Sequence, residues 1–214
     1  MESILEVLTP DNLVFIFKGF GLTLYISLIA IVLSTLIGTV LAVMRNGKNP
    51  ILRIISSIYI EFVRNVPNLL WIFTIFLVFK MKSTPAGITA FTLFTSAALA
   101  EIIRGGLNAV DKGQYEAGLV IGMTELEVFR RIVIPQAFRV ALPSLSNSFI
   151  GTMKGTSLGF TIGVVEIMAQ AKLLASKNYR VMESYMAALI IYWIIVILLV
   201  RVQKIIENKL NRAY

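Results

Sequence analysis

The chain has 214 residues, of which 57% are hydrophobic and 15% are charged, with a mean hydropathy of +0.82 and a net charge of +8. Soluble domains are about 45–50% apolar and about 25% charged, so a soluble fold would expose much of this apolar content to water. The absence of cysteine and histidine excludes disulfides, thiolate nucleophiles, zinc sites built on Cys or His, and Ser-His-Asp catalysis. A polytopic all-α membrane protein is therefore expected, and the positive charge is attributed to residues that flank spans, not to nucleic-acid binding.

The N-terminal segment is expected to stay in the mature protein. It carries Glu2, Glu6 and Asp11 where a cleavable signal peptide has basic residues, and the first apolar stretch is too long for a signal core. A spanning helix needs about 17–25 mostly apolar residues. Five regions meet that length within a single transmembrane domain covering 1–214. The expected spans are 19–44, 54–79, 86–103, 140–166 and 184–201, with a structured loop at 105–139.

Basic residues predict how these spans are oriented. The first loop, the third loop and the C-terminal tail hold twelve Lys and Arg, at positions 45, 48, 53, 104, 112, 130, 131, 139, 201, 204, 209 and 212. The N-terminus, second loop and fourth loop hold six, at positions 18, 80, 82, 172, 177 and 180. Because loops rich in Lys and Arg stay in the cytoplasm, the N-terminus is expected outside, and the third loop and C-terminus inside.

The third loop is predicted to contain two short helices with a sharp corner between them. Asp111 with Gln114, and Thr124 with Glu127, have the spacing of capping boxes that begin helices. Gly122 lies where the first helix would end with a positive φ. By shape alone, the same pattern also fits an ordinary amphipathic surface loop.

The residue pattern of this loop resembles a known family. Glu116-Ala117-Gly118, then Gly122 after three residues, then Ile-Val-Ile-Pro at 132–135 after nine more, resembles the EAA signature of ABC importer permeases. Gly118 and Ile134 replace the Ala and Leu of that signature. The segments 100–106, 135–139, 142–143 and 156–158, together with Asn147, resemble the polar amino acid permease subfamily in particular.

The resemblance implies a type I, MetI-like importer permease with a five-helix core in the cytoplasmic membrane of a prokaryote. It also implies four partners besides the lipid bilayer: a cytoplasmic ABC ATPase dimer that uses ATP, an extracytoplasmic solute-binding protein, a second permease subunit, and a polar amino acid. The chain has no GxxxxGK[ST] phosphate loop. It is therefore expected to be a transport subunit without enzymatic activity, with no cofactor, metal or nucleic acid of its own.

The same resemblance assigns coupling to the third loop. The segment 114–121 would be a coupling helix that moves as a rigid lever, with Glu116 anchoring the corner through a polar contact. Small residues at Ala117 and Gly118 would let the ATPase approach closely. The expected coupling residues are Gln114, Glu116, Ala117, Gly118, Gly122 and Thr124.

Ionisable residues inside spans mark a candidate solute pathway, because each costs about 2.5–3.5 kcal/mol to insert. Lys154 interrupts the fourth span among glycines at 151, 155, 159 and 163. Two interpretations stay open. The glycines can serve close helix packing, or they weaken the helix so that its backbone lines a polar cavity. In that cavity a solute carboxylate would meet Lys154, Thr156 or Ser157.

Two acid–base pairs at i,i+3 spacing complete the candidate pathway. Glu61 with Arg64, and Glu101 with Arg104, are interpreted as ion pairs with structural or gating roles. Glu166 is interpreted as an interfacial residue that follows the fourth span.

Departures from the subfamily pattern bear on substrate and pairing. Gly155 stands where Asp is usual, Trp71 stands where Gln is common, and Asn65-Val66 replace Gly-Thr. The missing carboxylate and amide favour a neutral or acidic substrate, such as glutamine or glutamate, over a cationic one. They also favour a different homologous chain as the second subunit, although an identical one remains open.

A membrane scaffold or small channel subunit is the alternative function. A scaffold has no reason to keep the pattern at 116–135, and it would not stimulate the ATPase activity of a partner.

Overall fold

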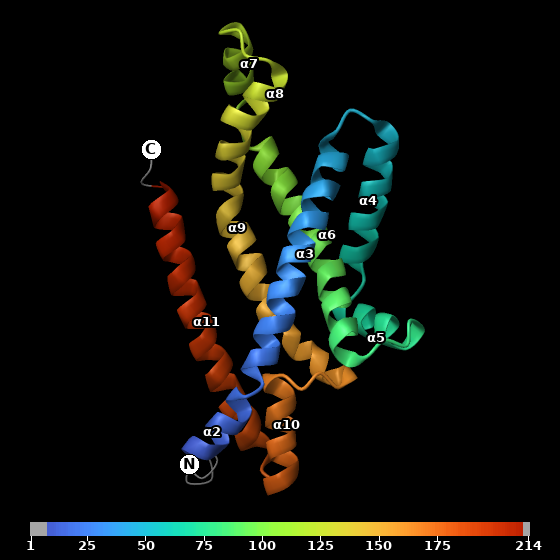
Figure 1. The fold of residues 1–214 in the computed structure, drawn as a ribbon, viewed down its shortest axis with the longest axis vertical. Helices are drawn as coiled ribbons and strands as arrows, with labels where there is room; N and C mark the ends of the chain where they lie inside the picture. The colour runs from blue at the N-terminus through green and yellow to red at the C-terminus, as the bar shows by residue number, and fades with distance from the viewer. Residues whose placement is uncertain (1–7, 212–214) are drawn as a thin grey trace.

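A computed structural model describes residues 8–211, and every regular element in this range is helical. In chain order the elements are α2 (Pro10–Phe17), α3 (Phe20–Asn46), α4 (Pro50–Asn65), α5 (Asn68–Val78), α6 (Ser83–Asn108), α7 (Lys112–Val120), α8 (Glu125–Val128), the π-helix η1 (Phe129–Val133), α9 (Ile134–Gly155), the 3₁₀-helix η2 (Thr156–Ile162), α10 (Ile167–Asn178) and α11 (Val181–Asn211). Helix α6 lies at the centre and packs against α3, α4, α5 and α9 (Figure 1).

The helices confirm an all-α polytopic membrane fold, with three to five candidate spans in the described residues. Three are long and apolar enough to cross a bilayer: Pro10–Asn46, Ser83–Asn108 and Val181–Lys209. Two more arise if each of two bent pairs is counted as one span. The pair α4 and α5 is bent by 103°, and the segment Glu125–Ile162 is bent by 46° from α10.

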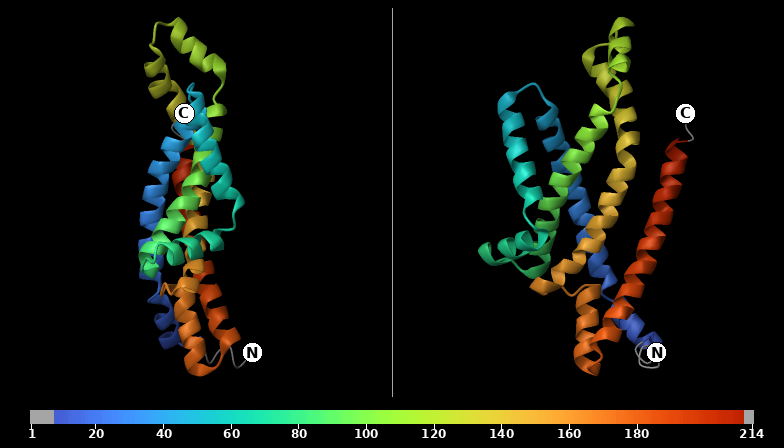
Figure 2. Two further views of the ribbon diagram at one scale, coloured as in Figure 1. Left: turned by 90° about the vertical axis from the view of Figure 1, so that its right-hand side faces the viewer. Right: turned by 180° about the vertical axis from the view of Figure 1, so that it is seen from behind.

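The bend between α4 and α5 divides the region expected as the span 54–79. Val66 has an extended backbone, with φ −97° and ψ 134°, and Pro67 follows it. Proline lacks the backbone N–H that a helix needs, and it disfavours the helical conformation of the residue before it. Helix α5 therefore turns nearly perpendicular to α4, as Figure 2 shows.

The fourth apolar region, expected as the span 140–166, also changes direction. Its α-helix ends at Gly155 and continues as η2, and Gly163 then makes a left-handed turn with φ +86°. Helix α10 lies in the segment expected as the fourth loop. Glu166 caps α10 by accepting a hydrogen bond from the Ala169 amide at 3.0 Å, and Tyr192 of α11 donates to the same carboxylate at 2.5 Å. Glu166 is fully buried within the chain, and its interpretation as an interfacial residue stays a prediction.

The basic segments gather at one end of the molecule. The connection between α3 and α4, the α7–α8 corner and the C-terminal end of α11 point the same way, whereas α2 and the turn between α10 and α11 lie at the opposite end (Figures 1 and 2).

Candidate functional site

The corner between α7 and α8, hereafter the elbow (111–128), has fixed geometry at both helix ends. Asp111 begins α7 by accepting a hydrogen bond from the Gly113 amide at 2.7 Å. At the other end, Gly122 has φ +87°, donates its amide to the Leu119 carbonyl at 3.0 Å, and is followed by Met123, which donates to the Gly118 carbonyl at 3.1 Å. These two bonds form a Schellman motif. The corner expected at Gly122 is confirmed.

Helix α8 begins with the expected capping box. The Thr124 hydroxyl accepts from the Glu127 amide at 3.3 Å, and the Glu127 carboxylate accepts from the Thr124 amide at 3.0 Å. The box expected from Asp111 and Gln114 is only half present, because the Gln114 side chain instead accepts from Gln136 of α9 at 3.3 Å. That bond ties the base of the elbow to the start of α9.

A pH dependence follows from the second cap. Hydrogen bonds from the Thr124 amide and hydroxyl, with a smaller contribution from Arg131, hold the pKa of Glu127 below its ordinary value. A carboxyl whose pKa is lowered in the folded state stabilises that state fully above its unfolded pKa, about 4.3, and this stabilisation is lost as pH falls through the folded pKa. Hydrogen-exchange protection of the α8 amides should therefore drop below about pH 4. Glu127→Gln should remove this dependence, and an unchanged acid response in that variant would contradict the assignment.

A π-helical segment joins the elbow to the membrane-spanning part of α9. In η1 the Ile134 amide donates to the Phe129 carbonyl, five residues back. Pro135 has no amide to offer the Arg131 carbonyl, so the regular helical bond is lost at this point. Single π turns inside helices often lie at functional sites. The chain passes from α8 into α9 without a loop, so a displacement of the elbow acts directly on α9.

The small residues of the elbow have different surroundings from those expected. Gly118 is buried, and a Cβ on it would lie 2.7 Å from Val128 Cγ2 and 3.0 Å from Ile132 Cδ1. Its small size therefore serves packing of α7 against α8 and η1 inside the chain. Glu116 and Ala117 are exposed, as a contact with a partner requires.

The apolar tip of the elbow was not among the residues predicted from the sequence. Val120 is 86% exposed, Ile121 is 76% exposed and Leu126 is 62% exposed. The sequence does contain a signal for this tip. Val120 and Ile121 directly precede the glycine corner, at the end of a helix that is too short to bury both side chains.

Charged residues of three helices meet in one network. Arg45 of α3 donates to Glu101 of α6 at 2.7 Å and to Glu61 of α4 at 3.2 Å. Arg104 donates to Glu101 at 2.9 and 3.2 Å, and Arg64 lies 3.9 Å from the same carboxylate. The Glu101–Arg104 pair is confirmed. The Glu61–Arg64 pair is wrong, because Glu61 pairs with Arg45 and the Arg64 guanidinium turns towards Glu101.

The structure separates the expected pathway residues. Lys154 and Ser157 line a pocket of about 370 Å³ beside Tyr192, whereas Arg64 lines another pocket, of about 410 Å³, between α4, α6 and α9. Thr156 is fully buried and donates its hydroxyl to the Met153 carbonyl, so this hydroxyl is already engaged.

The glycine run of the fourth span serves several purposes. Gly151 and Gly155 line the Arg64 pocket, which does not contain Lys154, Thr156 or Ser157. A Cβ on Gly159 would lie 3.2 Å from Val164 Cγ2, within the turn that leads to α10, and Gly163 supplies the positive φ of that turn.

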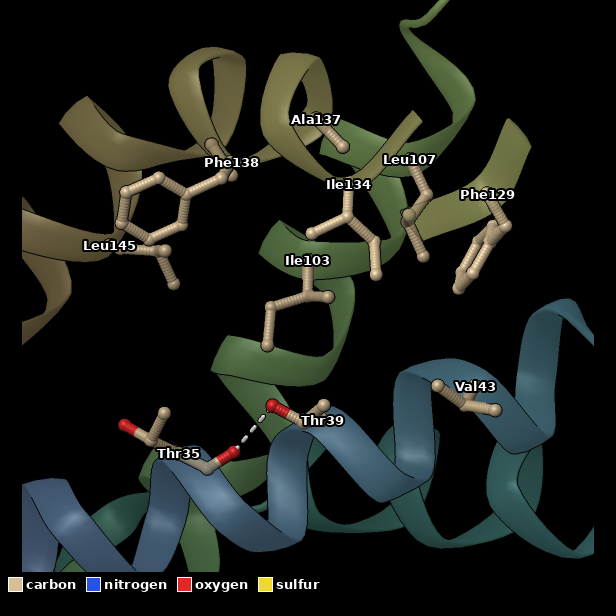
Figure 3. A pocket seen from close by; sticks show the side chains of 11 residues that line it. Thr35, Thr39, Val43, Ile103, Leu107, Phe129, Ile134, Ala137, Phe138 and Leu145 are labelled. Atoms are coloured by element: carbon tan, nitrogen blue, oxygen red, sulfur yellow. Dashed lines mark hydrogen bonds between the residues drawn. The ribbon is translucent and has the colours of Figure 1, made fainter. Parts of the chain in front are cut away.

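An apolar pocket of about 270 Å³ lies near the elbow, between α3, α6 and η1–α9 (Figure 3). Its walls include Val43, Ile103, Leu107, Phe129 and Leu145. The hydroxyl of Thr39, on the α3 wall, donates to the Thr35 carbonyl at 2.7 Å. These walls offer no charged group to a polar solute, so this pocket does not fit an amino acid.

Comparisons with known proteins agree with this architecture. The family described as "Binding-protein-dependent transport system inner membrane component" matches residues 34–212. The probable amino-acid permease protein YxeN of Bacillus subtilis (strain 168) is 39% identical in an alignment of 205 residues that covers 92% of each chain. The L-cystine transport system permease protein TcyB of the same organism is 36% identical over 200 residues, covering 91% of this chain and 86% of that one. A solved structure, of an amino acid ABC transporter with histidines, superposes with a TM-score of 0.86 at 32% identity, covering 91% and 94% of the two chains.

Proposed function

This chain belongs to the family of binding-protein-dependent transport system inner membrane components and is an amino-acid ABC transporter permease subunit. On this basis we propose that its elbow couples amino acid import to a cytoplasmic ABC ATPase. The observation that carries this proposal is an exposed apolar tip on a corner whose geometry is fixed. Val120 and Ile121 are largely exposed, and clustered exposed apolar residues mark interaction surfaces.

Each elbow residue has a role in this proposal. Gly122 and Thr124 fix the corner and the start of α8, and Gln114 fastens α7 to α9. Glu116 and Ala117 face the ATPase, whereas Gly118 keeps α7 tight against α8. When ATP binding closes the ATPase dimer, the elbow moves as one body and tilts α9 through η1. The apolar pocket between α3, α6 and α9 lies where that tilt would be accommodated.

The end of the molecule that carries the elbow faces the cytoplasm in this proposal, with the N-terminus outside. The support is that the α3–α4 connection, the elbow and the described C-terminal end of α11, which belong to the segments richest in Lys and Arg, lie towards that end, in agreement with the positive-inside rule. An extracytoplasmic binding protein would then deliver the amino acid to the opposite end. ATP is used by the partner ATPase, and this chain holds no cofactor.

The proposed substrate is a polar amino acid with a neutral or acidic side chain, similar to glutamine or glutamate. The relative named for cystine and the solved transporter with histidines support an amino acid as the substrate and do not favour a neutral or acidic side chain. In this proposal the solute path passes Lys154, Ser157 and Arg64, with Glu61 near it. Thr156 stabilises the start of η2 through its hydrogen bond to the Met153 carbonyl. A different homologous chain is proposed as the second permease subunit.

Gly122→Val tests the coupling role. Valine is strongly disfavoured at φ +87°, so the Schellman motif should open and the elbow should lose its shape. Association with the ATPase in a pull-down should fall at least tenfold, while membrane insertion stays unchanged.

Gly105→Val is the matched control, because this glycine is exposed on α6 and a Cβ there meets nothing within 4 Å. Wild-type association in the Gly122 variant would reject the coupling role. A scaffold or channel subunit, the alternative function, should also fail to stimulate the ATPase activity of the partner.

A further inference from the structure

We infer that the apolar pocket between α3, α6 and the η1–α9 segment holds one acyl chain of an anionic phospholipid, whose headgroup lies beside Lys48 and Arg130. The phospholipid comes from the leaflet on the elbow side of the molecule. This inference does not depend on the substrate or on the coupling role. It takes from the proposed function only the assignment of that leaflet to the cytoplasmic face.

The pocket lies at the depth of the acyl chains of one leaflet. Its α3 wall runs from Thr35 to Val43, and Arg45 is the first charged residue of this helix. The edge of the hydrocarbon core therefore falls near Arg45. At a rise of about 1.5 Å per residue, the wall lies about 3–15 Å below that edge. Half of a hydrocarbon core of about 30 Å is about 15 Å thick, so the pocket spans most of one leaflet.

The walls present hydrocarbon and no unpaired polar side chain. Nine of the eleven lining residues are apolar, and the other two are Thr35 and Thr39. Both threonines donate their hydroxyls to carbonyls one turn back in α3, Thr35 to Ile31 and Thr39 to Thr35, each at 2.7 Å. A polar solute placed here would lose its hydrogen bonds to water without replacing them. A hydrocarbon chain loses none.

Exposed apolar side chains flank the pocket on two of its walls. Leu36, Val40 and Val43 are exposed on α3, and Ile134 and Phe138 are exposed on α9. Lipid tails are as apolar as these side chains, so an acyl chain reaches the pocket without crossing a polar surface. The pocket volume of about 270 Å³ is just below the range of about 300–1,000 Å³ that is usual for ligand pockets. It therefore suits one chain and not a whole lipid.

Basic residues lie near one end of the pocket. Val43 and Phe129 line that end, as Figure 3 shows. Lys48 follows Val43 by five residues, in the α3–α4 connection, and Arg130 follows Phe129 directly. Both basic side chains are exposed, and neither forms an ion pair within residues 8–211. Basic residues beside a membrane attract anionic headgroups, so the occupant is an anionic phospholipid.

Photo-crosslinking in nanodiscs tests the acyl-chain site. The purified complex of permease and ATPase is reconstituted with phosphatidylglycerol that carries a diazirine in one acyl chain, and the labelled peptides are identified by mass spectrometry. In the wild type, labels should fall on the pocket walls at 35–43 and 129–145. Thr39→Trp fills the pocket from an exposed position, and it should reduce labelling of 129–145 at least fivefold.

Val40→Trp is the matched control, because it places the same side chain on the neighbouring exposed position outside the pocket. Labelling of 129–145 should stay at the wild-type level in this variant. Equal losses in the two variants, or no loss in Thr39→Trp, overturn the acyl-chain site. A wild-type pocket without label overturns it too, and is the result expected if the second permease subunit covers these walls.

The headgroup is tested by changing the unlabelled host lipid of the nanodiscs. Phosphatidylglycerol should compete for the wild-type pocket at least fivefold better than phosphatidylcholine with the same chains. Lys48→Gln combined with Arg130→Gln should abolish this preference while labelling of the pocket persists. Lys80→Gln combined with Lys82→Gln removes the same charge from the α5–α6 turn, and it should keep the preference.

An unchanged preference in the Lys48 and Arg130 double variant overturns the headgroup assignment. Nanodiscs carry the same lipids in both leaflets, so these outcomes hold whichever face of the protein is cytoplasmic. Association with the ATPase, measured by pull-down on the same samples, reports the coupling role separately. Failure of the lipid site and failure of the proposed function are therefore distinguishable.

Discussion

Replacing Glu101 with glutamine should lower the free energy of unfolding by about 1–3 kcal/mol, because two partly buried arginines lose the charge-assisted hydrogen bonds of the carboxylate that they share. The Glu101 side chain is 18% exposed and binds Arg45 of α3 and Arg104 of α6, with Arg64 of α4 nearby. Glutamine keeps the size of the side chain but removes its charge, so three guanidiniums would repel one another where three helices meet. Denaturant titration of the purified complex in detergent measures the loss.

Glu61→Gln is the control within the same network. The Glu61 side chain is 64% exposed and makes one contact with Arg45, at 3.2 Å. Exposed ion pairs contribute about 0–1 kcal/mol, so this variant should remain close to the wild type. Equal stability of the two variants would show that Glu101 is not the centre of the network.

Gly19→Ala should be the most disruptive change of a single methyl group in the chain. A Cβ at Gly19 would lie 2.5 Å from the Ile167 amide nitrogen and 2.6 Å from the Glu166 carbonyl oxygen. Both atoms belong to the backbone at the start of α10, so no side chain can rotate away. Overpacking usually costs about 1–3 kcal/mol, and a clash with backbone falls at the upper end. The expected result is a loss of about 3 kcal/mol of unfolding free energy.

Gly21→Ala provides the comparison, two residues further along the chain. A Cβ there meets nothing within 4 Å, and alanine favours a helix over glycine by about 0.5–1 kcal/mol. Gly21→Ala should therefore be neutral or stabilising. If Gly19→Ala were as stable as Gly21→Ala, the close approach of α3 to α10 would not be a feature of the native protein.

The Gly19 contact also shows how the end of the molecule opposite the elbow is held together. Gly19 fixes the α2–α3 junction against Glu166, and the Glu166 carboxylate accepts from Tyr192 of α11. Glu166 thus contacts both the start of α3, through Gly19, and α11, through Tyr192. From the sequence, Gly19 was predicted only as the start of a span, because nothing in the local sequence indicates which backbone segment it contacts.

Local features were predictable wherever their cause lies within a few residues. The Gly122 corner and the Thr124–Glu127 cap follow from backbone conformations and hydrogen bonds that span three to six residues. The Glu101–Arg104 pair follows from helical spacing. The break at Pro67 was equally local, but the apolar run on both sides of it concealed the break.

Sequence by itself determined that this chain is a helical membrane protein with an elbow of defined shape, because apolar length and turn chemistry are properties of short segments. Only the tertiary structure decided which charges meet. Glu61 pairs with Arg45 rather than Arg64, Lys154 and Arg64 lie in different pockets, and Gly118 packs inward instead of facing a partner. The physical reason is that these contacts join separate helices, and their partners depend on how α3, α4, α6 and α9 cross, which no local pattern encodes.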